Sequence, residues 1–201
     1  MAELKVLVIS SSPRKDGNSD LLAKEAMRSA QEAGCVVEYV RVLDMNISPC
    51  RACGHCEKKG VCAIPDDFPP LMKKMLDSDV LIFATPIYFM AVSAWGKMVI
   101  DRCQTLWARK YALKTPNRAE PEKAWAAVCI AVGGSRSVKM FDSIRLTMKY
   151  VYDVLEVSLF EEVFFNQLDY KGAVTEHPEA LREAYEKTKN VIIKLMELRR
   201  S

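Results

Sequence analysis

The feature of this sequence that most restricts its fold is a regular alternation of apolar, β-branched runs with amphipathic helical patterns. Runs that are hydrophobic throughout are typical of strands that helices cover on both faces. Five such runs lie at Leu4–Ser10, Val36–Val42, Asp79–Thr85, Trp125–Val132 and Val157–Phe165. Helical patterns lie between and after them, at Ser19–Ala33, Phe68–Asp77, Val92–Leu106, Val138–Leu155 and Pro178 to about Arg199.

This alternation predicts an α/β protein with a parallel sheet. Right-handed βαβ units build a three-layer, doubly wound sheet, for which the five-strand order 2-1-3-4-5 is a common solution. The 201 residues suit a single domain, residues 1–201, with a cysteine-rich insertion at about 44–66. In such a sheet we expect ligands to bind at the carboxyl ends of the strands.

The composition excludes several classes of protein. The 29 basic and 26 acidic side chains leave a net charge of +3 with no basic tract, so nucleic acid is not an expected partner. No run of about eighteen apolar residues occurs, so we expect no membrane span. The apolar stretch at the N-terminus is too short for an export signal and is predicted to be a strand. We therefore expect a cytoplasmic protein, whose seven cysteines stay reduced.

The loop after the first strand, Ser10–Ser19, is rich in hydrogen-bond donors. It supplies several serine hydroxyls, Asn18, Arg14 and the free amides at the start of a helix. Donors that converge at the positive end of a helix dipole favour a phosphate. The alternative is an ordinary helix cap at Asn18 or Ser19 with a turn at Gly17. The dinucleotide signature G-x-G-x-x-G is absent, so a Rossmann site for NAD is not predicted.

Two further loops follow the third and fourth strands. Pro86 predicts the end of the third strand and a rigid turn, because proline fixes its own φ and keeps Thr85 extended. Tyr88 could then form one wall of a site for a flat cofactor, or Tyr88 and Phe89 could pack under the following helix. After the fourth strand, Gly133–Gly134 would let the backbone approach a ligand closely, although a double glycine also makes ordinary turns.

Four of the cysteines are clustered in thirteen residues and need a chemical explanation. Cys50, Cys53, Cys56 and Cys62 have the spacing C-x2-C-x2-C-x5-C. Three thiolates spaced three residues apart can bind three irons of one cubane, and a short loop can bring the fourth thiolate to the remaining iron. This spacing favours a 4Fe–4S cluster. Zinc is one alternative, although structural zinc sites usually pair two knuckles that lie well apart in sequence. A metal-free thiol loop is the other.

The loops after the first and third strands resemble those of the NAD(P)H-dependent FMN reductases of the flavodoxin-like superfamily. Ser10–Ser19 is similar to the S-P-R-x-x-G-N-S/T loop that holds the FMN phosphate, with Ser11 in place of the usual glycine. Thr85–Arg102 is similar to the T-P-I/V-Y loop and the K-x-x-I-D-R helix that border the isoalloxazine. The resemblance implies a flavodoxin-like three-layer doubly wound sheet of five parallel strands. The residues expected to bind FMN lie in these two loops and in the double-glycine loop after the fourth strand: Ser10, Ser12, Pro13, Arg14, Asn18, Ser19, Thr85, Pro86, Ile87, Tyr88, Phe89, Gly133 and Gly134.

The cysteine motif is similar to that of the iron–sulfur flavoproteins, a branch of the same superfamily in which a compact four-cysteine motif follows the second strand. This resemblance implies that Cys50, Cys53, Cys56 and Cys62 bind the cluster. It also implies an FMN-dependent oxidoreductase that acts in electron transport, with a redox partner protein or NAD(P)H as its partner.

Two alternative functions stay open at this stage. One is an NAD(P)H-dependent flavin or quinone reductase without a cluster. The other is a non-enzymatic, receiver-like interaction domain, although Ser10 and Thr85 stand where such a domain has its acidic pocket. In the electron-transfer case we expect a homo-oligomer, a dimer or tetramer. The predicted loop Thr105–Lys123, with Trp107 and Tyr111, would help to form its interface.

Overall fold

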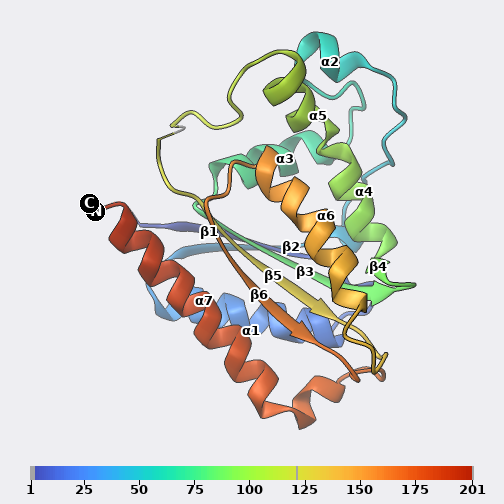
Figure 1. Ribbon diagram of the computed structural model, residues 1–201, viewed down its shortest axis with the longest axis vertical. Coiled ribbons are helices and arrows are strands. Elements are labelled where there is room, and N and C mark those ends of the chain that lie inside the picture. Colours follow the sequence, from blue (N-terminus) through green and yellow to red (C-terminus); the bar gives the residue numbers. More distant parts are fainter. Residues whose placement is uncertain (1–2, 121, 201) are drawn as a thin grey trace.

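The computed structural model describes residues 3–120 and 122–200 and has the predicted three layers (Figure 1). Its strands are β1 (Lys5–Ser10), β2 (Val36–Arg41), β3 (Val80–Tyr88), β4 (Ala91–Val92), β5 (Ala126–Val132) and β6 (Leu159–Phe165). The five long strands are parallel and lie in the order β2-β1-β3-β5-β6. Counted along the chain, this is the predicted order 2-1-3-4-5. The sixth strand, β4, is a short antiparallel partner of β3 that the sequence analysis did not predict.

Helices cover both faces of the sheet. The helices α1 (Asn18–Glu32) and α7 (Pro178–Leu198) lie on one face, and α3 (Phe68–Asp77), α4 (Ala94–Arg102) and α6 (Met140–Val154) lie on the other (Figure 1). Alternate strand residues point to opposite faces, so Val8 packs with the first pair of helices and Ile9 with the second group. Burial on both sides explains why the strand segments are hydrophobic throughout.

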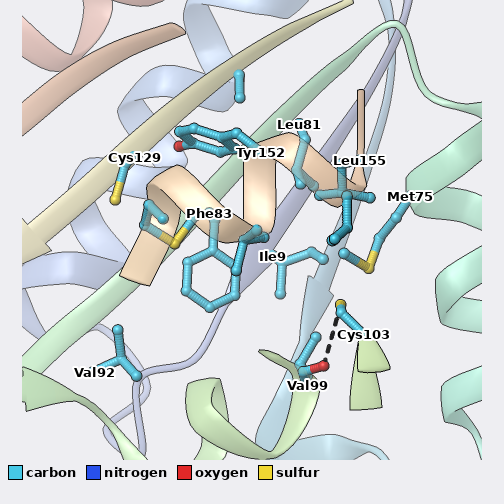
Figure 2. Packing of buried hydrophobic residues seen from close by; sticks show 14 of the residues in the cluster. Ile9, Met75, Leu81, Phe83, Val92, Val99, Cys103, Cys129, Tyr152 and Leu155 are labelled. Atoms are coloured by element: carbon cyan, nitrogen blue, oxygen red, sulfur yellow. Dashed lines mark hydrogen bonds between the residues drawn. The ribbon is translucent and has the colours of Figure 1, made fainter. Parts of the chain in front are cut away.

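Figure 2 shows the core between the sheet and the second group of helices, where Ile9 and Phe83 from the strands meet Met75 and Leu155. Cys103 belongs to this core, and its thiol donates a hydrogen bond to the carbonyl oxygen of Val99 at 3.4 Å. Burial, with the nearby charge of Asp101, raises the pKa of Cys103 to about 12. This thiol is therefore a packing group and not a reactive one.

Pro86 does not end the third strand, which corrects the prediction. Pro86 itself still pairs with β5, and β3 continues for two residues beyond it, which pair with β4. The N–H of Ser11 donates to the carbonyl oxygen of Ala84, so the backbone polar groups of Ala84 face β1, and those of Pro86 face the same side. In this parallel ladder the N–H that proline lacks would have paired with the Ser11 carbonyl, which accepts a hydrogen bond from the Ser93 hydroxyl instead.

The chain reverses two residues later in a tight hairpin. Phe89 and Met90 both have positive φ, at 49° and 61°, which is the backbone of a two-residue hairpin turn. This turn creates β4 and places Ser93 at the start of α4, where its side chain accepts a hydrogen bond from the Gly96 N–H.

The second predicted long loop is partly helical. After α4 the chain continues through α5 (Gln104–Trp107) and a π-helical turn, η2 (Ala108–Ala112), and becomes irregular only beyond them. The short helix η1 (Val42–Asp44) leads into the cysteine-rich insertion, which contains the short helix α2 (His55–Lys59). Figure 1 shows α2 beside α5 at one end of the molecule. The last short helix, η3 (Ala173–Glu176), precedes α7. Across residues 3–120 and 122–200, no helix is long and apolar enough to cross a membrane.

Candidate functional site

A cavity of about 130 Å³ opens at the carboxyl ends of the strands. Four segments far apart in the sequence line it: the loops after β1, β5 and β6, and the end of β3. The lining residues are Ser12, Arg14, Gly17, Asn18, Ser19, Pro86, Ile87, Tyr88, Val132, Gly133, Gly134, Leu168, Asp169 and Lys171. The three loops that sequence analysis selected thus meet at the edge where a doubly wound sheet binds its ligands.

The loop after β1 has the features of an anion site. The Ser19 hydroxyl, in the first turn of α1, is buried and has no hydrogen-bond partner among the described residues. Ser12 closes the preceding turn, because its hydroxyl donates to the Arg14 carbonyl at 2.9 Å and accepts from the Arg14 N–H at 3.2 Å. A Cβ at Gly17 would lie 2.9 Å from Ser12 Oγ, so the turn closes this tightly only with glycine. A phosphate at the helix N-terminus would satisfy the orphaned hydroxyl.

Ser10 lies beneath this loop and does not line the cavity. Its hydroxyl donates to Asp20 at 2.6 Å, and the same carboxylate accepts hydrogen bonds from Tyr39 and from the Asp16 N–H. Burial by itself raises the pKa of Asp20, but these hydrogen bonds and Lys24 lower it below its ordinary value. Ser10 therefore belongs to a buried network that holds the loop in shape. Pro13, also predicted for the site, is half-buried in the loop but does not line the cavity.

Asn18 lines the cavity, but its side chain is engaged with the segment after β6. Its Nδ2 donates to the carbonyl oxygens of Leu168 and Tyr170 at 3.1 and 2.9 Å, and its Oδ1 accepts from the Val174 N–H at 3.2 Å. The amide group thus joins the start of α1 to a segment about 150 residues later in the chain.

The end of β3 is tied to the loop after β1 through Ser93. Thr85 is fully buried, and its hydroxyl accepts a hydrogen bond from the Ser93 N–H at 3.0 Å. The Ser93 hydroxyl donates in turn to the Ser11 carbonyl at 2.8 Å. Thr85 therefore positions the loop and does not line the cavity, while the next three residues do. Tyr88 is 44% exposed at the cavity, whereas Phe89 points fully into solvent at 103% and lies outside it.

Both glycines of the loop after β5 are required by close contacts. A Cβ at Gly133 would lie 2.7 Å from the Met140 sulfur, and one at Gly134 would lie 2.6 Å from Asp169 Oδ1. Both glycines line the cavity, and the close approach of their backbone to a ligand stays a prediction.

The segment after β6 is the part of the site that the sequence analysis missed. It contributes Leu168, Asp169 and Lys171 to the cavity lining. No motif marks these residues, but the carboxyl end of the fifth parallel strand had to emerge at the same edge as the others. This rule for parallel sheets could have predicted that the segment after the fifth long strand belongs to the site.

A second cavity, of about 370 Å³, is lined by all four cysteines of the insertion. Cys50 and Cys53 are exposed, and Cys56 and Cys62 are half-buried. Burial raises the pKa of Cys56, and the other three thiols add to this effect. Within the described parts of the chain, no group of three or more His, Cys, Asp or Glu side chains is arranged to hold a metal ion. The four thiols therefore surround a cavity and do not converge on a point.

The base of the cysteine cavity is a buried ion pair. Arg102, at the end of α4, is 1% exposed and binds Asp66 with two nitrogens at 2.7 and 2.9 Å. It also donates to the Ser48 carbonyl at 2.7 Å, so it fixes both ends of the insertion. Burial raises the pKa of Asp66, but the hydrogen bonds from Arg102 and from two backbone N–H groups outweigh it and lower the pKa to about 2. The Arg102 Nε lacks a hydrogen-bond partner among the described residues.

Two larger hollows, of about 770 and 950 Å³, lie at the opposite edge of the sheet. Their lining includes Leu4 and Lys5 at the start of β1, and Trp125 just before β5. Neither hollow contains any of the motifs, so size alone does not identify the site.

The parallel sheet in the order β2-β1-β3-β5-β6, covered by helices on both faces and with a cavity at its strand ends, defines a flavodoxin-like fold. The profile of the family described as NADPH-dependent FMN reductase matches residues 4–152, and the chain belongs to that family. An iron–sulfur flavoprotein of Methanocaldococcus jannaschii is 41% identical over 103 residues, which are 51% of this chain and 53% of the relative. A putative NAD(P)H-dependent FMN-containing oxidoreductase of Bacillus subtilis is 32% identical over 132 residues, 65% of this chain and 67% of the relative.

The similarity to curated relatives is partial in length. An iron–sulfur flavoprotein of Methanosarcina thermophila is 34% identical over 134 residues, 67% of this chain and 65% of that protein. The chain thus spans about half to two thirds of the relatives it matches. Among solved structures, a flavone reductase has a TM-score of 0.71 at 21% identity, covering 98% of this chain and 64% of that one. A quinone oxidoreductase of Methanothermobacter marburgensis has a TM-score of 0.70 at 15% identity, with coverages of 94% and 97%. These structures confirm the fold.

Proposed function

We propose that this chain is an FMN-dependent oxidoreductase that works as an electron-transfer iron–sulfur flavoprotein. The observation that carries the proposal is the pair of motif-lined cavities at the two ends of one helix. α4 follows Ser93, which bonds to both flavin loops, and ends at Arg102, which lines the cysteine cavity. At nine residues it is roughly 13 Å long. One rigid element thus links the proposed flavin site to the proposed cluster site.

The cavity at the strand ends fits the polar end of FMN. Ser19 supplies an orphaned hydroxyl, and the first turn of α1 supplies free N–H groups. Arg14 adds a cation. At about 130 Å³ the cavity is smaller than the ~300 Å³ or more that encloses a whole ligand of this kind. We infer that it takes the phosphate and the adjoining chain, and that the flat ring lies at its open side beside Tyr88.

The cysteine cavity suits a cluster better than zinc. Tetrahedral zinc with bonds of about 2.3 Å holds its sulfurs about 3.8 Å apart, which requires the thiols to converge. Here the four cysteines line a space of about 370 Å³. In a cubane each cysteine binds a different iron, so the four sulfurs lie farther apart than around a single zinc ion. Cys50, Cys53, Cys56 and Cys62 would be its ligands.

Bound FMN exchanges one or two electrons and a bound cluster exchanges one, so the pair can match two-electron with one-electron partners. The residues of the chain would bind and orient these groups. Arg14 and Ser19 hold the phosphate, Gly133–Gly134 admits the ring, and Arg102 fixes the cysteine insertion. The electron partner in this proposal is a redox protein or NAD(P)H.

The second candidate is an NAD(P)H-dependent flavin or quinone reductase in which the cysteines bind no cluster. It is favoured by the relative from Bacillus subtilis and by the absence of a converged set of ligands in the described residues. The receiver-like alternative has less support, because Ser10 and Thr85 are buried and hydrogen-bonded where it would need exposed acids.

We also infer a cytoplasmic homo-oligomer, a dimer or tetramer. Trp107 and Tyr111 are each 41% exposed, and their rings lie 5.9 Å apart on the helical segment beside the cysteine insertion. Light scattering on the purified protein tests this, and a monomer at micromolar concentration would contradict it.

The deciding experiment for the function is anaerobic purification followed by flavin, iron and acid-labile sulfide analysis. We expect FMN, and about four iron and four sulfide atoms for each chain. Electron paramagnetic resonance after reduction should show a cluster signal. Stoichiometric zinc, or no metal after reconstitution, would remove the cluster and support the second candidate if NAD(P)H is oxidised.

A further inference from the structure

The segment between β6 and η3 is held against the start of α1 by one side chain. Asn18 makes three hydrogen bonds to it, through the Leu168 and Tyr170 carbonyls and the Val174 N–H. These bonds use both Nδ2 hydrogens and the oxygen of the amide, so Asn18 has little capacity left for a ligand. The segment also lies beyond residue 152, where the match to the reductase family ends.

The hydrogen bonds of Asn18 hold the segment so that Lys171 lines the cavity. It stands between Tyr170, whose carbonyl is bonded to Asn18, and Gly172, whose φ of +86° turns the chain into η3. Lys171 and Arg14 are the two cations among the lining residues, and neither side chain has an ion pair or hydrogen bond with another described residue. They line the same small cavity as the orphaned hydroxyl of Ser19.

We propose that Lys171 is a second cation for the FMN phosphate, and that Asn18 is a positioning residue for it and not itself a phosphate ligand. The inference rests on the proposed FMN binding. A dianionic phosphate at the N-terminus of α1 would be stabilised by the helix dipole and by the two cations. The acidic residue of the lining, Asp169, lies against Gly134 in the loop after β5. Lys171 therefore distinguishes FMN from riboflavin, which lacks the phosphate.

The test is a double-mutant cycle in the apoprotein, with FMN and riboflavin affinities measured by quenching of flavin fluorescence. We expect Lys171→Ala to weaken FMN about three- to tenfold, because Lys171 is an exposed cation meeting a doubly charged group. Riboflavin should change less than twofold. Asn18→Ala should lose a similar factor, and the double variant should lose no more than Asn18→Ala alone, because both changes remove one contact.

Hydrogen exchange gives a readout independent of binding. In Asn18→Ala the Val174 amide should exchange faster, since it loses its acceptor, while Lys171→Ala leaves it protected. Lys189→Ala, an exposed lysine on α7, is the matched control and should leave both affinities unchanged. If Asn18→Ala does not fold, the exposed Lys171 variant alone carries the test.

Three results would overturn the inference in distinguishable ways. Unchanged FMN affinity in Lys171→Ala removes the lysine from the site. Additive losses in the double variant make Asn18 a direct phosphate ligand. Failure of the unaltered protein to bind FMN refutes the proposed function itself, and with it this inference.

Discussion

The cavity at the strand ends, which we propose for the flavin and call the flavin cavity, and the cavity lined by the four cysteines, the cysteine cavity, lie towards opposite ends of α4 and are stabilised in different ways. The flavin cavity is formed by the ends of parallel strands and by glycines that admit no Cβ, so the sheet fixes it. The cysteine cavity is formed by an insertion with one short helix and largely exposed thiols, and its base is the Arg102–Asp66 pair. One site is therefore preformed by the fold. The other depends on one buried ion pair.

The largest expected effect is the loss of the cluster when one ligand is removed. Cys56→Ala should abolish or convert the cluster and leave FMN bound, because the two sites share no lining residue. Iron, sulfide and flavin analysis of anaerobic protein measures both. Cys35→Ala, at a cysteine outside the cavity, is the control and should keep both groups. Loss of FMN together with the cluster would show that the cavities are not independent.

The next effect concerns the base of the insertion. Arg102→Met should lower the free energy of unfolding by about 3–5 kcal/mol, because it leaves the Asp66 carboxylate buried and unpaired. Urea denaturation of the apoprotein measures this. Arg145→Met, which removes an exposed ion pair with Glu162, should cost less than about 1 kcal/mol. Equal costs for the two variants would show that the Arg102 pair contributes no more than a surface pair.

The same pair predicts a dependence on pH. The pKa of Asp66 is about 2 in the folded protein and about 3.9 when unfolded, so its contribution is present above pH 4 and is lost as the pH falls towards 2. The shift corresponds to about 2–3 kcal/mol. Unfolding free energies at intervals from pH 6 to 2.5 should show this loss in the unaltered protein and in Asp142→Asn, an exposed control. Asp66→Asn should be less stable at pH 6 and lack this part of the decline. A parallel decline in all three would remove Asp66 as its source.

The architecture could be predicted because it follows from periodicity. Runs that are apolar throughout require helices on both faces, and alternation with helices then fixes parallel strands and a shared ligand edge. For the same reason Tyr88 and Gly133, which are 45 positions apart, could be expected at one site, and both line the cavity. The positions of helices and strands could therefore be predicted without knowledge of individual contacts.

Individual hydrogen-bond partners could not be predicted in this way. Ser10 and Asn18 lie in the expected loop, but Ser10 bonds to buried Asp20 and Asn18 bonds to a segment 150 residues away, and only the folded chain supplies those partners. The hairpin at Phe89 was missed because residues other than glycine seldom take positive φ. The conformational propensity of a short segment does not determine which distant residues it will contact.

The smallest expected effect sharpens the contrast between the two cavities through charge. Arg14 lines the flavin cavity and Arg51 lines the cysteine cavity, and both are exposed. Arg14→Ala should weaken FMN about three- to tenfold and leave riboflavin unchanged, because an exposed charge-assisted contact to a phosphate is modest and screened. The loss should shrink at 0.5 M salt, where the screening length falls to about 4 Å.

Arg51→Ala is the control and should leave both flavin affinities unchanged. Isothermal titration of the apoproteins measures these values. If Arg14→Ala weakened riboflavin and FMN binding equally, the arginine would stabilise the fold of the loop and would not bind the phosphate. If Arg51→Ala weakened FMN binding, the flavin would lie nearer the cysteines than the strand ends.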